Sequence, residues 1–78
     1  MERNGRSGLQ LARLRVERHM TQAKLGELAG FRTDYISQLE RGRYSISDSS
    51  LVRLAKALKL TTEKLERELS QGSAKAGG

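Results

Sequence analysis

Four polar side chains near the middle of the chain could form hydrogen bonds to the edges of nucleic-acid bases, and they are Thr33, Asp34, Ser37 and Gln38. Their spacing places them on one outer face if residues 33–41 form a helix with Ile36 and Leu39 turned inward. Gln38 can then bond an adenine through two hydrogen bonds, Thr33 can offer a hydroxyl and a methyl group to a thymine, and Asp34 can accept from a cytosine amino group. Ser37 would tolerate several bases. The pattern predicts a base-reading helix, with a merely solvated helix face as the alternative.

Basic and hydrogen-bonding side chains on both sides of this segment could contact the phosphates that frame such a helix. Arg32, just before the segment, has the reach for a guanine or a phosphate. Gln22 opens an earlier expected helix, where its side chain and the free backbone N–H groups can meet a phosphate. Gly42 lies between two arginines and would let backbone amides approach a phosphate closely. The remaining phosphate candidates are Lys24, Tyr35, Arg41, Arg43 and Tyr44.

The segment 22–41 has the spacing of two short helices that pack against each other. Its inward positions are Leu25, Gly26, Ala29, Phe31, Ile36 and Leu39, which recur at helical intervals. Gly30 supplies the positive φ that the end of a helix commonly needs. Gly26 costs about 1 kcal/mol relative to Ala in a helix interior, which indicates that the helices approach closely there. The segment therefore predicts a helix, a tight turn and a second helix.

Further helices must supply a core for this unit, and the periodicity predicts five helices in all. The first begins near Leu9 and turns Leu11 and Leu14 inward. Thr21 is predicted to cap the second helix, and Ser47 is predicted to cap the fourth. The fifth begins after Thr61. This reading makes the chain a compact all-α protein.

Both ends of the chain are polar and contain glycine, unlike the periodic middle. We therefore expect residues 1–8 to form a flexible arm and residues 71–78 to form a flexible tail. The folded domain is expected to span residues 9–70.

Composition limits the classes of protein to which the chain can belong. Its 78 residues suffice for one small domain, and a net charge of +6 with a pI near 10.3 favours a polyanionic partner such as nucleic acid. The absence of cysteine excludes disulfides and thiolate metal sites. No apolar run approaches the roughly 20 residues that span a membrane, and the N-terminus lacks the features of a signal peptide. We expect a cytoplasmic protein without metal, cofactor or membrane partner.

The segment from Met20 to Leu65 resembles the helix-turn-helix domain of phage repressor and Cro-type (XRE-like) regulators. The resemblance rests on the Thr-Gln opening of the first motif helix, the Gly at the turn, the Tyr-Ile-Ser of the second helix, the Leu-Glu-Arg-Gly exit and the Leu-Ala-Lys-Ala-Leu helix beyond it. It implies a lambda-repressor-like fold and sequence-specific binding of double-stranded DNA. The family usually has a short polar cap at the position of Arg32, so Thr33 or the backbone must cap the helix here.

Within that family the chain is most similar to controller proteins of restriction-modification systems. This narrower resemblance rests on the small size, on the Arg-Thr-Asp-Tyr-Ile-Ser stretch and on Ser45-Ile46-Ser47, where many relatives have a proline. It implies a bacterial or phage-encoded regulator that binds upstream of its own gene and a restriction enzyme gene. Such a protein would activate or repress according to occupancy, would reside on the nucleoid when bound, and as an activator would also meet RNA polymerase.

Arg15 and Glu40 match positions that form a partly buried salt bridge in the phage repressors that the chain resembles. If the bridge is deeply buried, removal of one partner strands the other at a cost of about 3 to 5 kcal/mol. The alternative is an exposed pair that contributes about 0 to 1 kcal/mol. We expect a structural role for the pair.

A homodimer on a palindromic operator is expected, because one short helix reads too few base pairs to be selective. Two copies about 34 Å apart would read consecutive major grooves on one face of the duplex. Leucines on and before the fifth helix are the predicted dimer interface, because a small monomer has little capacity to cover them, although Leu65 could belong wholly to the core. They are Leu60, Leu65 and Leu69.

Other classes of function find less support in the sequence. His19 is the only histidine, and the serines at 45–50 lack a neighbouring base that the sequence can identify. Glu63, Glu66 and Glu68 alternate with basic residues, as on a solvated helix face. We therefore expect no enzyme. The alternative function is an antitoxin or protein-interaction module that binds DNA mainly for autoregulation, which a long disordered extension would favour.

Overall fold

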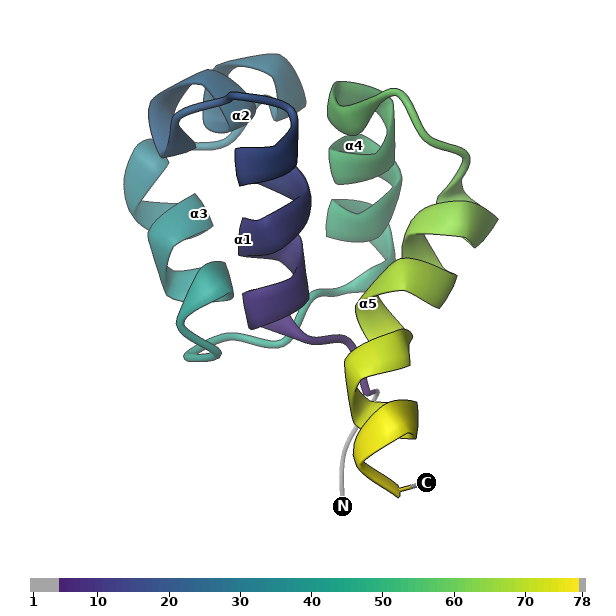
Figure 1. The fold of residues 1–78 in the computed structure, drawn as a ribbon. Helices are drawn as coiled ribbons and strands as arrows, with labels where there is room; N and C mark the ends of the chain where they lie inside the picture. Colours follow the sequence, from purple (N-terminus) through teal and green to yellow (C-terminus); the bar gives the residue numbers. More distant parts are fainter. Residues whose placement is uncertain (1–4, 78) are drawn as a thin grey trace.

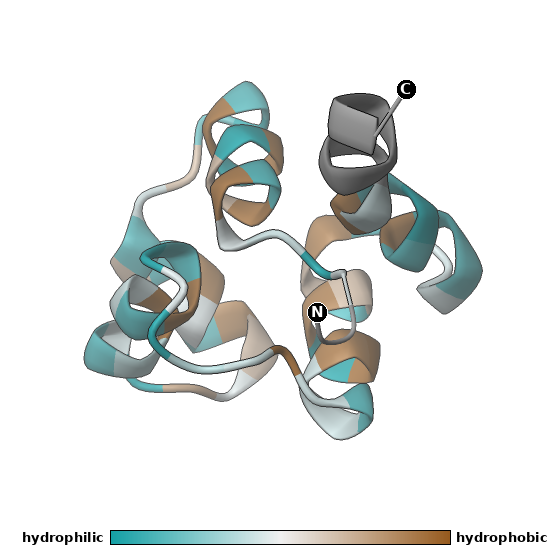
Figure 2. Cartoon of the chain, turned by 90° about the horizontal axis from the view of Figure 1, so that it is seen from below, coloured by the Kyte–Doolittle hydropathy of each residue, from teal (hydrophilic) through white to brown (hydrophobic). Residues whose placement is uncertain are grey.

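Helices provide all the regular secondary structure in residues 5–77, the part of the chain that the computed structural model describes, with side chains described as far as residue 70. The five helices are α1 (Gly8–Glu17), α2 (Gln22–Ala29), α3 (Thr33–Glu40), α4 (Asp48–Leu58) and α5 (Thr62–Gly77) (Figure 1). Each helix carries both hydrophobic and hydrophilic stretches (Figure 2). The predicted five-helix, all-α fold is confirmed.

Four of these helices begin with the same side-chain cap. A hydroxyl oxygen accepts from the backbone N–H three residues later, which satisfies one of the amides that a helix start leaves free. The donor and acceptor pairs are Gln10 to Ser7, Lys24 to Thr21, Ser50 to Ser47 and Lys64 to Thr61. The predicted caps at Thr21 and Ser47 are therefore confirmed.

The turn between α2 and α3 is as tight as the glycines predicted. Gly30 ends α2 with a left-handed φ of 80°. A Cβ at Gly26 would lie only 2.6 Å from the carbonyl oxygen of Phe31, so a side chain there would push the turn away from α2. The expected packing reason for Gly26 is confirmed.

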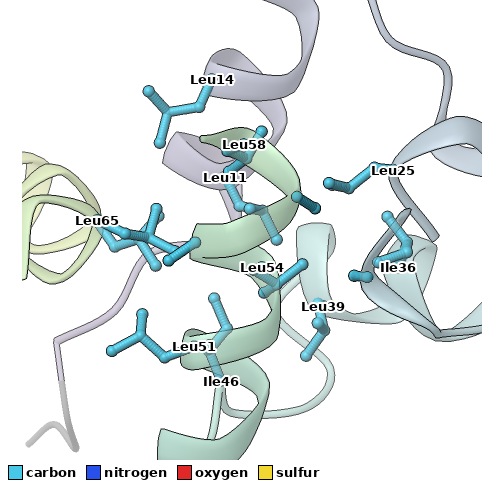
Figure 3. Packing of buried hydrophobic residues seen from close by; sticks show 14 residues of the cluster. Leu11, Leu14, Leu25, Ile36, Leu39, Ile46, Leu51, Leu54, Leu58 and Leu65 are labelled. Atoms are coloured by element: carbon cyan, nitrogen blue, oxygen red, sulfur yellow. The ribbon is translucent and has the colours of Figure 1, made fainter. Parts of the chain in front are cut away.

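Leucines and isoleucines from all five helices and from the loop before α4 form one core. Figure 3 shows the side chains of α4 between Leu65 on one side and Leu25 and Ile36 on the other. The largest fully buried side chains are Leu11, Leu25, Ile36, Leu39, Ile46, Leu54, Leu58, Leu65 and Leu69. The core thus joins the two helices of the motif to α1, α4 and α5.

The burial of α5 contradicts part of the predicted dimer interface. Leu65 and Leu69 have no exposed surface within one copy of the chain, because α5 packs on α1 and α4. They therefore have no surface to offer a second copy. Leu60 is only partly buried against the core.

The folded part also extends beyond both predicted domain limits. At the N-terminal side, Ser7 caps α1 and its N–H donates to the carbonyl of Leu69 at 3.0 Å. The Arg6 guanidinium donates to Glu66 and Asp48, so residues 6–8 are not a free arm. At the other end α5 continues to Gly77. The part of the predicted arm before Gly5 lies outside the described residues.

None of the described helices is long and apolar enough to cross a membrane. Within the same residues, no three side chains of the metal-binding types gather into a site that could hold an ion.

Candidate nucleic-acid interface

α3 presents the predicted base-reading residues on its outer side. Ile36 and Leu39 are fully buried and fix the inner side of the helix. Arg32, Thr33 and Asp34 are exposed. Ser37 and Gln38 are half-buried, so these two are less open to solvent than the sequence analysis expected.

The start of α3 resolves the question of its cap. Arg32 occupies the N-cap position, and no side chain caps the helix there. The carbonyl of Arg32 instead accepts from the N–H groups of Tyr35 and Ile36. The N–H groups of Thr33 and Asp34 thus point out of the helix start without a side-chain partner, next to the side chains predicted to read bases.

Gln38 lines a hollow of about 510 Å³ together with Arg43 and Tyr44. The Oε1 atom of Gln38 is buried and accepts no hydrogen bond among the described residues. A buried amide oxygen without a donor is uncommon and costs free energy. The hollow thus joins one predicted base reader to two predicted phosphate contacts.

The segment after α3 corrects one expectation about phosphate binding. The N–H groups of Arg41, Gly42 and Arg43 donate to the carbonyls of Ser37, Leu39 and Gln38 respectively. Gly42 adopts a positive φ of 79°, as a glycine that ends a helix does. These amides are therefore occupied by the helix end and are not free for a phosphate. The side chains of Arg41 and Arg43 remain exposed.

The carboxylate of Glu40, at the end of α3, accepts hydrogen bonds from side chains of α1 and α2. It accepts from Arg15 Nε at 2.7 Å, from Arg15 Nη2 at 3.1 Å and from Gln22 Nε2 at 3.0 Å. Another nitrogen of Arg15 donates to the carbonyl of Met20. The side chains of Arg15 and Glu40 are only 14% and 6% exposed, and the hydrogen bonds from Arg15 to Glu40 raise the pKa of the guanidinium. The ion pair predicted for these residues is present, and it is enclosed.

Gln22 thereby links Glu40 of α3 to the start of α2. The amide of Lys24 is capped by Thr21, which leaves the N–H groups of Gln22 and Ala23 as the free donors of that helix start. The side chain of Lys24 is exposed and lies 3.6 Å from Glu27. The positive end of the α2 dipole is thus open beside a basic side chain.

Aromatic rings on and beside α3 contact one another. The ring of Tyr35 lies 4.8 Å from that of Phe31 and 6.0 Å from that of Tyr44. The hydroxyl of Tyr35 forms a hydrogen bond with Ser50 of α4 at 2.9 Å. Tyr35, predicted as a phosphate contact, is therefore half-buried and has a partner inside the protein.

Sequence reasoning missed Arg53 of α4, which reaches the turn between α2 and α3. Its Nε donates to the carbonyl of Ala29 and its Nη2 donates to the carbonyl of Gly30. One signal was available, because α2 has no basic residue in its last turn to meet its own free carbonyls.

Comparison with known proteins identifies the chain. Residues 11–65 match the helix-turn-helix family HTH_3. The chain belongs to this helix-turn-helix family. A transcriptional regulator of the helix-turn-helix type from Sinorhizobium fredii, itself uncharacterized, is 43% identical over 51 residues, which are 65% of this chain and 66% of that protein. The chain thus spans just under two thirds of the length of that relative.

Solved structures of other helix-turn-helix proteins share the fold. The restriction-modification controller protein C.AhdI from Aeromonas hydrophila superposes with a TM-score of 0.70 at 31% identity, over 74% of this chain and 88% of that one. The DNA-binding domain of the P22 C2 repressor superposes with a TM-score of 0.73 at 30% identity, over 90% and 93% of the two chains. The P22 C2 fragment is named as the DNA-binding domain of a repressor, and the Sinorhizobium relative is named as a transcriptional regulator.

Proposed function

We propose that this helix-turn-helix regulator reads its operator with the outer face of α3. The observation that carries the proposal is the contrast between the two sides of that helix. Ile36 and Leu39 are fully buried, whereas no hydrogen bond or ion pair occupies the side chains of Arg32, Thr33 and Asp34 within the described chain. A rigid helix with free polar side chains is what recognition in a major groove requires. Ser37 and Gln38 complete the reading face.

Phosphate contacts would frame that face on both sides. At the start of α2, the free N–H groups of Gln22 and Ala23 and the side chain of Lys24 favour an anion. After α3, the exposed side chains of Arg41, Arg43 and Tyr44 can reach the other side of the groove. The hydrogen bond from Gln22 to Glu40 fixes the distance between the two sets. The contacts at α2 would therefore set the depth of α3 in the groove.

The regulator is proposed to act as a homodimer on a two-fold symmetric operator. α3 has eight residues, so it spans about 12 Å and reaches the bases of a short half-site only. A second copy placed about 34 Å away doubles the sequence that is read. With Leu65 and Leu69 inside the monomer, Leu60 is the member of the predicted interface that can still meet a second copy.

Similarity to a restriction-modification controller protein supports a more specific proposal. The regulated genes would be its own gene and that of a restriction enzyme, with activation or repression set by occupancy of the operator. Activation would add RNA polymerase as a partner. Transcription from the neighbouring promoters, measured with and without the protein, tests this assignment.

The reading face is tested with DNA that the wild-type protein enriches from a random duplex pool. Thr33→Ala and Gln38→Ala are each expected to reduce the free energy of binding to the enriched sequence by about 1 to 3 kcal/mol, and to unrelated DNA by much less. Arg43→Ala is expected to weaken binding to both DNAs alike and to reduce the slope of the salt dependence by about one. Equal losses on both DNAs for Thr33→Ala and Gln38→Ala would remove them from the reading face.

The dimer is tested separately by sedimentation and by operators that carry one or two half-sites. A protein that binds one half-site as tightly as two, and that stays monomeric at all concentrations, would contradict the dimer. That result would leave the assignment of α3 intact.

A further inference from the structure

The C-terminal end of α2 is held by a side chain from another helix. The last carbonyls of a helix lack partners within it, and α2 has no basic residue in its own last turn. Arg53 of α4 supplies the missing donors, with Nε 3.0 Å from the carbonyl oxygen of Ala29 and Nη2 2.9 Å from that of Gly30. Its positive charge also meets the negative end of the α2 dipole.

The same guanidinium packs on the residue that leads into α3. Its central carbon lies 4.4 Å from the centre of the Phe31 ring. That ring also lies against the ring of Tyr35, in the first turn of α3, whose hydroxyl forms a hydrogen bond with Ser50 of α4. Ser50 and Arg53 are one turn apart on α4. Neighbouring residues of α4 therefore contact both Phe31, just before α3, and Tyr35, in its first turn.

Glycine at position 30 makes room for this contact. A Cβ there would lie 2.5 Å from Nη2 of Arg53. Gly30 therefore has a second role besides its positive φ, because it lets the guanidinium reach the turn. The contact between Arg53 and the turn therefore depends on the absence of a side chain at Gly30.

We propose that Arg53 is a positioning residue for DNA reading, which sets the direction in which α3 enters the groove. The inference rests on the proposed role of α3. Thr33, a proposed base reader, follows Phe31 by two residues, so a shift of Phe31 moves Thr33 directly. Arg53 acts through the turn and does not touch the DNA.

An arginine is needed here for geometric reasons. The planar guanidinium donates to two carbonyls and stacks on a ring at the same time, whereas a lysine keeps the charge but offers one ammonium and no plane. Arg53→Lys therefore separates positioning from charge. A phosphate contact would survive that substitution, and a positioning contact would not.

Arg18 provides a matched control. It also holds the end of a helix from outside, since its Nε donates to the carbonyl of Leu58 in the last turn of α4. That site is the other end of α4 from Ser50 and belongs to the α4–α5 turn, not to the turn before α3. Arg18→Lys should reduce stability in the same way without altering DNA reading.

The experiment measures binding of the wild type, Arg53→Lys and Arg18→Lys to the duplex that the wild type enriches from a random pool, and to an unrelated duplex. All three are compared at a temperature where circular dichroism shows them fully folded. For Arg53→Lys we expect the preference for the enriched duplex to fall about tenfold or more, the size of one lost base contact, with an unchanged salt slope on the unrelated duplex. Arg18→Lys should keep the preference.

Each outcome decides between explanations. An unchanged preference for Arg53→Lys overturns the inference, as does an equal fall for Arg18→Lys, because both results reduce Arg53 to a structural cap. Arg53→Ala is measured as a fourth protein, and a loss of affinity for both duplexes that Arg53→Lys restores would make Arg53 a phosphate contact instead. If the wild type itself enriches no sequence, the proposed function fails before Arg53 is tested.

Discussion

Two arginines form ion pairs with carboxylates on distant parts of the chain, and their surroundings differ. Arg15 pairs with Glu40 behind the candidate interface, and Arg6 pairs with Glu66 and Asp48 where the N-terminal segment meets α4 and α5. The two guanidinium side chains are equally enclosed, at 14% and 12% exposed. Glu40 is only 6% exposed, whereas Glu66 and Asp48 are 39% and 93% exposed.

This difference shows why the exposure of the carboxylate matters more than the distance between the charges. If Arg15 is removed, Glu40 stays enclosed, and Gln22 is the side-chain partner that remains to it among the described residues. If Arg6 is removed, Glu66 and Asp48 regain water. We therefore expect loss of the Arg15–Glu40 ion pair to lower the free energy of unfolding far more than loss of the Arg6–Glu66 ion pair.

The largest expected effect is that of Arg15→Ala, which leaves the enclosed carboxylate of Glu40 without its guanidinium partner. Such a substitution is expected to lower the free energy of unfolding by about 3 to 5 kcal/mol, as measured by urea denaturation. Glu17→Ala, which removes an exposed carboxylate from the end of α1, should change it by less than about 0.5 kcal/mol. A cost near that of the control would mean that water reaches Glu40 freely.

A smaller effect is expected from Arg6→Ala. The variant loses the ion pairs to Glu66 and Asp48 and the hydrogen bond to the carbonyl of Ile46, but both carboxylates return to solvent. The free energy of unfolding should fall by about 1 to 2 kcal/mol in the same urea measurement. Arg67→Ala, an exposed position on α5, serves as the control. A loss as large as that of Arg15→Ala would remove the contrast between the two bridges.

The smallest effect is a dependence on pH at the terminal bridge. The hydrogen bond from Arg6 is the main cause that lowers the pKa of Glu66 below its ordinary value of 4.5. A carboxyl whose pKa is lower in the folded state stabilises the fold fully above the ordinary value, and this contribution is lost as the pH falls through the folded pKa. Thermal unfolding followed below pH 4.5 should therefore show a weaker acid dependence for Glu66→Gln than for the wild type. If the unfolding temperatures of the two proteins fell in parallel with pH, Glu66 would not contribute to the acid dependence of stability.

Local rules sufficed for much of the fold and of the candidate site. Gly30 predicted the turn and Thr21 predicted a helix start, because each acts on backbone groups within a few residues of itself. The inward face of α3 followed from the spacing of Ile36 and Leu39. The proposed base-reading face was then the other side of the same helix.

Features that depend on distant partners were not predicted in the same way. Arg6 bonds Glu66 across 60 residues and Arg53 bonds Ala29 across 24, and no local pattern marks either pair. Leu69 was predicted to lie in a dimer interface because a small monomer has little capacity to cover it, but α5 packs on α1 and α4 and leaves Leu69 fully buried. The Arg15 and Glu40 pair was reached through family resemblance and not through spacing.

The joining of Ser7 and Arg6 to α5 also bears on the order in which the chain folds during synthesis. Because synthesis runs from the N-terminus, Arg6 and Ser7 emerge well before their partners Glu66 and Leu69 on α5. Until α5 emerges, Leu65 and Leu69 are missing from the core, and α1 has no α5 to pack on. The nascent chain should therefore remain susceptible to proteases until α5 leaves the exit tunnel. DNA recognition would then begin only after α5 has emerged and packed on α1 and α4.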